Sequence, residues 1–322
     1  MDTNSHISST PLRVAVIGPG AIGLFFGGLL SRLGLEVWFL DKSEGRAAYL
    51  VKHGLLLEET TGVTSIPLKV TTAMAGIGPC DLVIICVKSY DTASAASLLP
   101  SLIHQNTLVL TLQNGLGHIE ILKKVLPERQ IAVGVTFHGV TLVEIGHIRH
   151  AGEGPTYIGS SLPDEKMRGQ LVKLAEFLTA AGLATEAVDN IEGIVWNKLL
   201  VNIGINALSA LTRLKNGDLV KFPEIQNLMA MAITEALAVA RSKGLRVNPE
   251  AIKEAKAACL ATAGNRSSML QDVMNKKRTE IEAINGAIVK EAKALGIATP
   301  VNEVLTLLVR GIEKSYNLQV ER

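Results

Sequence analysis

Short runs of β-branched and aliphatic residues alternate with helix-like stretches through the first half of the chain. The strongest of these runs predict strands, which lie at 13–18, 36–41, 80–88 and 106–115. The near-continuous apolar stretch at 82–87 is typical of a strand covered on both faces. Repeated strand–helix–strand units with short connections predict a parallel, doubly wound sheet. Further extended segments are predicted at 54–59, 65–72, 130–140 and 147–159.

The pattern changes near residues 185–190, after which helical periodicity dominates and β-type runs disappear. Gly244 and Gly296 occupy predicted helix C-caps, and Pro249 and Pro300 predicted helix starts. The stretches rich in Ala, Leu, Glu and Lys predict long helices over 224–243, 249–262, 266–294 and 301–315. The chain is therefore expected to have three parts, which are a disordered tail at 1–11, an α/β domain at 12–188 and an all-α domain at 189–322.

Composition and charge exclude some classes of protein. The 322 residues are 48% hydrophobic and 19% charged, so the chain can fold into two domains with sizeable cores. There are 32 basic and 30 acidic residues and a net charge of +2, which gives no reason to expect a nucleic acid or a membrane surface as partner. The uncharged run at 14–31 contains Gly-Pro-Gly, so it predicts a strand and a separate helix rather than a membrane span. We expect a cytoplasmic protein.

The cysteines add no chemistry of their own. Cys80, Cys86 and Cys259 are widely spaced, with no C-x-x-C motif and no nearby histidine partner. They are expected to be ordinary buried thiols in a reducing compartment, and no metal site is expected.

A glycine motif follows the first predicted strand and opens the first predicted helix. Gly18, Gly20 and Gly23 form G-x-G-x-x-G, in which the glycines allow a tight turn, close approach of a pyrophosphate, and close helix–strand packing. The helix N-terminus then offers N–H groups to the phosphates. This context predicts a dinucleotide site formed by Gly18, Pro19, Gly20, Ala21, Ile22 and Gly23.

The residues that follow other predicted strands do not decide between NAD and NADP. Asp41 ends the second strand, where an acid binds ribose hydroxyls and favours NAD. Lys42 and Arg46 beside it could bind a 2′-phosphate and favour NADP. Lys88 and Asn114 follow two further strands at the edge where such folds bind ligands, but a surface lysine and an Asn-Gly turn explain them about as well.

One apolar helix in the second half carries polar residues in register. Lys198, Asn202 and Asn206 are four residues apart and therefore project from one helix face. Any one of them could be a helix-tying amide or a snorkelling lysine. Because unpaired buried polar groups cost about 1–3 kcal/mol each, three in register favour a wet, functional face.

A second polar constellation lies further along the chain. Asn265 and Ser268 are three residues apart and are predicted to share a helix face, and Glu280 follows Ser268. Taken alone, Glu280 would be assigned to solvent, because Glu is mostly exposed.

The sequence resembles the ketopantoate reductases (2-dehydropantoate 2-reductases) from about residue 12 to residue 317. The segments that carry the resemblance are "GPGAIG", "VKSYDT", "LQNG", "WNKLLVNIGINALSAL" and "SSMLQDVMNKKRTEIEAING". The resemblance implies a Rossmann-type domain at 12–188 followed by an all-α, 6-phosphogluconate dehydrogenase-like domain at 189–322 that carries substrate binding and catalysis. It also implies NADPH-dependent reduction of 2-dehydropantoate to (R)-pantoate, in pantothenate and coenzyme A synthesis.

The resemblance also implies roles for individual residues. Lys198 would be the proton donor, and Glu280 would lie where substrate and cofactor meet. Asn114 would reach both molecules, and Val140 would contact the cofactor through its backbone. The expected substrate-binding residues are Asn114, Asn202, Asn206, Asn216, Asn265 and Ser268. The cofactor residues would be the Gly18–Gly23 turn, Asp41, Lys42, Lys88, Asn114, Val140 and Glu280.

The sequence also leaves alternatives open. Lys42 stands where many family members have an arginine that binds the 2′-phosphate, and Asp41 precedes it, so NADPH is expected with NADH as the alternative. A reductase of another 2-keto acid or imine and a non-catalytic NADPH-binding sensor are the alternative functions. The expected partner is a small 2-keto acid, and a homodimer is left open.

Overall fold

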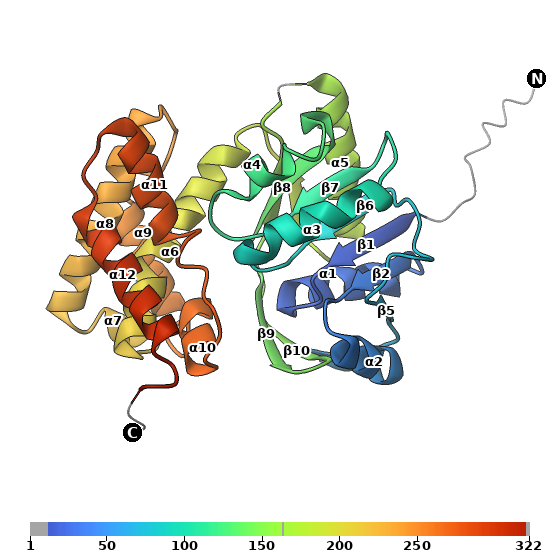
Figure 1. Cartoon of the computed structure of the whole chain (residues 1–322), viewed down its shortest axis with the longest axis horizontal. Coiled ribbons are helices and arrows are strands. Elements are labelled where there is room, and N and C mark those ends of the chain that lie inside the picture. The colour runs from blue at the N-terminus through green and yellow to red at the C-terminus, as the bar shows by residue number, and fades with distance from the viewer. Residues whose placement is uncertain (1–11, 163, 320–322) are drawn as a thin grey trace, which may run out of the picture. The chain divides into compact units, whose positions relative to one another are not determined.

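The computed structural model describes residues 12–162 and 164–319, and it comprises two compact units. Unit 1 runs to Gln113 and continues over His118–Ile191, whereas unit 2 comprises Asn114–Gly117 and Glu192 onwards. The predicted disordered tail at 1–11 lies outside the described residues. Unit 1 is an α/β fold and unit 2 is helical, which confirms the predicted fold class (Figure 1).

The main sheet of unit 1 has eight strands in the order β12-β11-β8-β7-β6-β1-β2-β5. Its central strand β1 is parallel to β2 and β6, and Val14 lies opposite Val37 and Leu82. The sheet is mixed, because β11 runs antiparallel to β8, whereas the sequence predicted a purely parallel sheet. The strands are β1 (Arg13–Ile17), β2 (Glu36–Leu40), β5 (Lys69–Thr71), β6 (Leu82–Ile85), β7 (Leu108–Thr111), β8 (Ile131–Thr136), β11 (Thr156–Gly159) and β12 (Thr185–Ala187).

Hydrophobic cores cover both faces of this sheet. Because side chains alternate along a strand, Val14 and Val16 of β1 face one core, and Ala15 and Ile17 face the other. The first core includes side chains from α1 (Ala21–Arg32), α2 (Glu44–His53) and α5 (Glu165–Ala180). The second includes side chains from α3 (Thr92–Leu98) and α4 (His118–Leu122).

A second sheet of unit 1, in the order β4-β3-β10-β9, was not predicted. Extended segments were expected here, but they form their own sheet rather than joining the main one. Leu55 and Leu57 of β3 are buried while Leu56 between them is exposed, so one face of this sheet packs inward. The strands are β3 (Leu55–Glu59), β4 (Gly62–Ile66), β9 (Gly139–Glu144) and β10 (His147–Gly152), and β9 and β10 form a long pair in Figure 1.

Unit 2 packs its helices around one apolar core. Pro300 begins its last helix, and Gly244 and Gly296 have the positive φ typical of residues that follow helix ends, as predicted. Pro249 instead lies two residues before its helix. The helices are α6 (Ile191–Thr212), α7 (Asn216–Leu219), α8 (Pro223–Ser242), α9 (Ala251–Ala261), α10 (Ser268–Met274), α11 (Asn285–Leu295) and α12 (Pro300–Lys314).

The single long helix predicted over 266–294 is wrong. Helix α10 ends at Met274 and α11 begins at Asn285. Lys276 between them has φ +51, a left-handed conformation that stops a helix. The intervening segment carries Glu280, which therefore lies in an irregular turn and not on a helix face.

Helix α6 meets the length and composition requirements of a bilayer span among the described residues. However, 61% of its most apolar window is buried inside the protein, which is the pattern of a core helix. The run at 14–31 forms strand β1 and the separate helix α1, as the Gly-Pro-Gly predicted.

Candidate active site

The glycine turn joins β1 to α1, and two of its glycines are required by close packing. Gly18 has φ +94, and a Cβ there would lie 2.7 Å from Val87 Cγ1. A Cβ on Gly23 would lie 2.3 Å from the Gly18 carbonyl oxygen. A side chain at Gly18 would therefore clash with the loop after β6, and one at Gly23 would force the turn and the helix apart.

Gly20 differs from these two glycines, since nothing in the protein lies within 4 Å of its Cβ position. It is the N-cap of α1, and no side chain caps that helix end. Gly18, Pro19, Gly20, Ala21, Ile22 and Gly23 together leave an open cradle at the helix N-terminus. Such a cradle suits the pyrophosphate of a dinucleotide, so the residues present fit this cofactor.

Asp41, which follows β2, is almost fully buried and already engaged. Both its carboxylate oxygens accept hydrogen bonds from Arg46, from Nη2 at 2.6 Å and from Nε, and the Ser43 backbone N–H donates at 2.9 Å. The hydrogen bonds that Arg46 donates to Asp41 raise the pKa of Arg46. Lys42 is exposed and pairs with Asp91 at 2.6 Å. The end of β2 thus presents cationic side chains, and the Asp41 carboxylate is neutralised by Arg46.

Lys88 follows β6, where it begins a short 3-10 turn at Ser89–Asp91. Gln113 holds the start of this loop, because its Nε2 donates to the Val87 carbonyl at 3.0 Å and to Thr92 Oγ1 at 2.8 Å. Sequence reasoning did not identify Gln113, although it immediately precedes the Asn114–Gly115 pair. Its amide ties the loops after β6 and β7 together.

The Asn114–Gly117 segment belongs to unit 2, although it follows a strand of unit 1. The Leu116 N–H donates to the Ala283 carbonyl at 2.9 Å. Gly115 has φ +84, and a Cβ there would lie 2.2 Å from that same carbonyl oxygen. Gly115 is therefore needed both for the turn and for close docking onto the segment that carries Glu280.

Lys198 is partly buried on α6, with Asn202 and Asn206 on the same helix. Burial lowers the pKa of Lys198 to about 8, and the charge of Glu280 partly opposes that shift. Glu280 itself is 6% exposed, so its charge acts on Lys198 with little screening by water. The structure thus joins, within unit 2, two residues that lie 82 positions apart in the sequence.

Hydrogen bonds connect three segments of unit 2 that carry predicted substrate residues. Ser209 Oγ donates to the Asn206 carbonyl at 3.0 Å and lies 2.5 Å from Ser267 Oγ, which caps α10 by accepting from the Leu270 N–H. The Asn216 N–H donates to the Asn265 carbonyl at 3.0 Å. Ser209 and Ser267 were not identified from the sequence, because a small buried serine carries no pattern of its own.

Asn265 and Ser268 do not share a helix face, contrary to the prediction. Asn265 lies in the irregular segment before α10, and Ser268 is the first residue of that helix. The spacing rule failed here because it applies only within a continuous helix.

No cluster of three or more His, Cys, Asp or Glu side chains that could hold a metal ion occurs within residues 12–162 and 164–319. The three cysteines are free thiols, and burial raises the pKa of Cys80 to about 11 and that of Cys86 to about 12. They are therefore protonated and unreactive near neutral pH.

Comparison with known protein families places both halves of the chain. Residues 14–162 match the family model described as "Ketopantoate reductase PanE/ApbA". Residues 190–313 match the model described as "Ketopantoate reductase PanE/ApbA C terminal".

Individual relatives match over almost their whole length. A 2-dehydropantoate 2-reductase of Halobacterium salinarum is 37% identical over 300 residues, which cover 93% of this chain and 98% of that protein. A ketopantoate reductase family structure from Ralstonia eutropha has a TM-score of 0.87 and 34% identity, covering 95% of this chain and 100% of that one. D-mandelate dehydrogenase, solved with NADH and anilino(oxo)acetate, has a TM-score of 0.90 and 30% identity with the same coverage. Both matched family models and the near full-length relatives show that this chain belongs to the ketopantoate reductase family.

Proposed function

We propose that this chain reduces 2-dehydropantoate to (R)-pantoate with NADPH, and that Lys198 is the proton donor. The observation that carries the proposal is the state of Lys198, a lysine on an apolar helix whose pKa burial lowers to about 8. At that pKa most of the side chain is protonated near pH 7, yet it gives up its proton far more readily than an ordinary lysine. Family membership supplies the reaction to which such an acid is suited.

In the proposed mechanism NADPH, when bound, supplies the hydride that adds to the ketone carbon of the substrate. Lys198 Nζ donates a hydrogen bond to the ketone oxygen and then a proton as negative charge develops there. The Glu280 carboxylate favours the protonated form of Lys198, and so keeps the acid charged until the reaction needs its proton.

The neighbouring polar side chains of unit 2 are proposed to hold the substrate. Asn114, Asn202, Asn206, Asn216, Asn265 and Ser268 offer neutral hydrogen-bond donors suited to a carboxylate and a hydroxyl group. The backbone bond from Asn216 to Asn265, and the serine pair linking α6 to α10 beside Asn206 and Ser268, support four of these residues. A preorganised set of donors lowers the entropy cost of binding a small, flexible acid.

The choice of NADPH over NADH is proposed from the state of Asp41. A free carboxylate at this position would bind ribose hydroxyls and repel a 2′-phosphate. Here Arg46 engages both carboxylate oxygens, so the acid is neutralised and a half-exposed guanidinium stands beside it. Arg46→Ala should therefore weaken NADP⁺ binding more than NAD⁺ binding, by about tenfold or more, since it both removes the cation and frees the acid. Equal weakening of the two cofactors would contradict this preference.

A second candidate is an NADH-dependent reductase of an aromatic 2-keto acid. The similarity to D-mandelate dehydrogenase solved with NADH, with a TM-score of 0.90, favours this alternative. The glycine cradle and Lys198 would serve that reaction equally well. The two candidates differ only in the keto acid that is reduced and in whether the cofactor carries a 2′-phosphate.

The deciding experiment is an absorbance assay of NADPH and NADH oxidation, with 2-dehydropantoate and with phenylglyoxylate as substrates. A kcat/KM highest for 2-dehydropantoate with NADPH supports the proposal. A kcat/KM highest for phenylglyoxylate with NADH establishes the second candidate instead. Tight NADP⁺ binding with no oxidation of NADPH by any keto acid would instead indicate a non-catalytic cofactor-binding sensor.

A further inference from the structure

Two histidines join separate segments of unit 1 next to the first helix. His138 lies in the turn between β8 and β9, and its Nδ1 is 3.0 Å from Nε2 of His150 on β10. The ring of Phe25 on α1 packs against both imidazoles, with centroid separations of 5.2 Å to His138 and 4.4 Å to His150. The histidine pair thus connects the helix of the glycine turn to both strands of the long pair β9–β10.

The turn that carries His138 is tightly packed on its other side. The Phe137 N–H donates to the Pro155 carbonyl at 3.0 Å, and a Cβ on Gly154 would lie 2.7 Å from the Phe137 carbonyl oxygen. Gly139 also packs against Gly152, since a Cβ on Gly139 would lie 3.3 Å from the Gly152 Cα. Val140, whose backbone is expected to contact the cofactor, comes next, so the conformation of this turn decides where that backbone lies.

The hydrogen bond between the two rings limits which ring nitrogens can carry a proton. Each neutral imidazole carries one N–H, and the bond uses one of the two as donor. His138 Nε2 is buried without a hydrogen-bond partner among the described residues. An N–H there would be an unsatisfied buried donor, which is costly, so His138 Nδ1 donates to His150 Nε2 and the other proton lies on His150 Nδ1.

A further proton would disrupt this arrangement. With the shared proton retained, the only nitrogen left to accept another is His138 Nε2, which is buried and has no acceptor nearby. The pKa of His138 is lowered accordingly, by burial first and then by His150, with Glu153 opposing.

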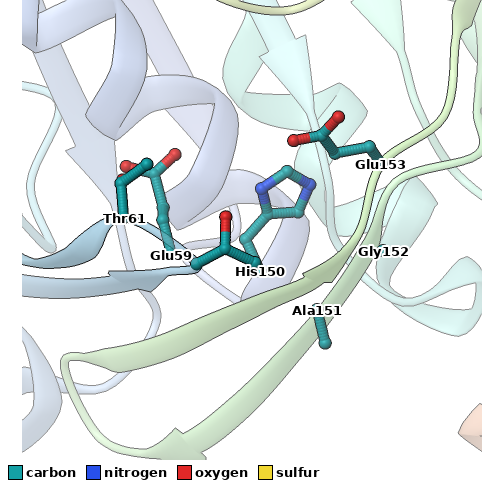
Figure 2. Close-up of a pocket in the computed structure, with 7 residues that line it drawn as sticks. Glu59, Thr61, His150, Ala151, Gly152 and Glu153 are labelled. Atoms are coloured by element: carbon teal, nitrogen blue, oxygen red, sulfur yellow. The ribbon is translucent and has the colours of Figure 1, made fainter.

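The surrounding charges do not supply the missing acceptor. His150 stands in a pocket of about 160 Å³ that Glu59, Thr61 and Glu153 also line, with the Glu153 carboxylate on one side of the ring and Glu59 and Thr61 on the other (Figure 2). Glu59 of β3 is paired with Arg32 of α1 at 3.3 Å. Phe25, the contact from α1, is uncharged. The pocket therefore surrounds His150, while His138 Nε2 remains unsatisfied.

We propose that the His138–His150 pair is a positioning device that holds the Gly139–Val140 backbone in the conformation that receives the nicotinamide dinucleotide, and that it works only while the pair is uncharged. The inference rests on the proposed NADPH-dependent function and on the backbone contact with the cofactor that the family resemblance implies for Val140. It requires neither residue to touch the substrate. Dinucleotide affinity should therefore fall as the pH drops below the ordinary histidine range, where His138 is forced to take a proton.

The test is direct binding of NADP⁺ to the full-length protein by calorimetry between pH 5 and 8, without substrate. His138→Ala and His150→Ala should each weaken binding about five- to tenfold at neutral pH, which corresponds to the loss of one hydrogen bond. The double variant His138→Asn, His150→Gln places amides near the two bonded nitrogens. It should keep near-native affinity at neutral pH, because amides can hydrogen-bond, and lose less affinity in acid, because they do not titrate.

His147→Gln is the matched control. This histidine also lies on β10 but pairs with Glu58 at 3.2 Å, so its replacement should leave the wild-type binding profile unchanged. The 2′-phosphate of free NADP⁺ itself titrates at about pH 6, for variants and wild type alike, so the informative quantity is the ratio of affinities between variant and wild type at each pH.

Alanine variants that bind NADP⁺ as tightly as wild type would overturn the proposal, as would a double variant with the wild-type acid profile. If the alanine variants do not fold, the double variant decides alone. Because no turnover is measured, a failure of the proposed substrate would appear separately, as normal NADP⁺ binding without oxidation of NADPH by 2-dehydropantoate.

Discussion

The two units build their halves of the proposed chemistry in opposite ways. In unit 1 the proposed cofactor cradle is made by backbone, in which Val87 and a carbonyl oxygen leave no room for side chains at Gly18 and Gly23, while Gly20 faces open space. In unit 2 the proposed site is made by polar side chains, such as Lys198 and Glu280, beside an apolar helical core. Backbone chemistry binds a feature shared by all dinucleotides, whereas side chains can select one substrate and supply a proton.

Buried charged side chains are also compensated differently in the two units. In unit 1 Asp41 and Arg46 form a close ion pair, which raises the pKa of the Arg46 guanidinium and keeps it charged. In unit 2 burial of Lys198 outweighs the charge of Glu280, and the pKa of the lysine falls. A tight ion pair stabilises charge, but a loosely compensated buried cation is a better acid.

The largest expected effect comes from removing the proposed acid of unit 2, which should impair catalysis but not the binding of the cofactor. Lys198→Ala should lower kcat about 10²- to 10⁴-fold, the usual contribution of a general acid, while the Kd for NADP⁺ stays within about twofold of wild type. Lys198→Arg keeps the charge but not an acid that can lose its proton, so it should not restore kcat. Steady-state kinetics and calorimetry give the two quantities.

Lys243→Ala controls for the loss of a lysine, since it removes a partly exposed residue of the same unit that pairs with Glu291. Its kcat should match that of wild type. Near-normal turnover of Lys198→Ala would show that another group donates the proton.

A glycine pair tests the backbone cradle of unit 1. Gly20→Ala should raise the Kd for NADP⁺ about tenfold or more with little change in Tm, because φ −83 suits alanine and only the ligand would meet the new methyl group. Gly23→Ala should also lower the free energy of unfolding by about 1–3 kcal/mol, because its Cβ would clash with the Gly18 carbonyl. Calorimetry and thermal unfolding measure the two effects.

Gly169→Ala on α5 is the matched control, since its Cβ would point into open space away from the cradle. It should leave NADP⁺ binding unchanged and stabilise the helix slightly. If Gly20→Ala bound NADP⁺ normally, the pyrophosphate could not lie against this glycine.

The same contrast explains what could be predicted from sequence. The glycine turn was predictable because backbone constraints leave a fixed spacing within one strand–turn–helix unit, and the Lys198–Asn202–Asn206 register was predictable because α6 is continuous. The break in the helix before Glu280 could not be predicted, since Lys276 adopts a left-handed conformation that residue type alone does not indicate. The small sheet of β3 and β10 also escaped prediction, because pairing between strands so distant in the chain leaves no local pattern.

A smaller effect tests the electrostatic coupling within unit 2. Reduction needs protonated Lys198, so kcat/KM should hold at lower pH and fall as the pH rises through about 8. Glu280 raises the pKa of Lys198, so Glu280→Gln should move this alkaline limb to lower pH, whatever it does to the maximum rate. The pH profile of kcat/KM for 2-dehydropantoate at saturating NADPH measures the shift.

Glu282→Gln is the matched control, because this nearby exposed acid pairs with Arg310 and does not affect the pKa of Lys198. Its alkaline limb should coincide with that of wild type. An unmoved limb in Glu280→Gln would mean that the two side chains are not coupled in the working enzyme.

The smallest effect concerns the serine pair that links α6 to α10. Ser209 is fully buried, and its hydroxyl connects the Asn206 carbonyl to Ser267, the N-cap residue just before Ser268. Ser209→Ala should raise the KM for 2-dehydropantoate about two- to tenfold, the value of one hydrogen bond, and leave the Kd for NADP⁺ unchanged. Thr212→Val is the control, because that hydroxyl donates to the Leu208 carbonyl of its own helix and accepts from the Leu214 N–H just after the helix, and so does not link α6 to α10. A KM change shared by both variants would indicate a general loosening of α6. A KM change confined to Ser209→Ala would show that unit 2 positions its substrate donors through side-chain hydrogen bonds, in contrast to the backbone cradle proposed for the cofactor in unit 1.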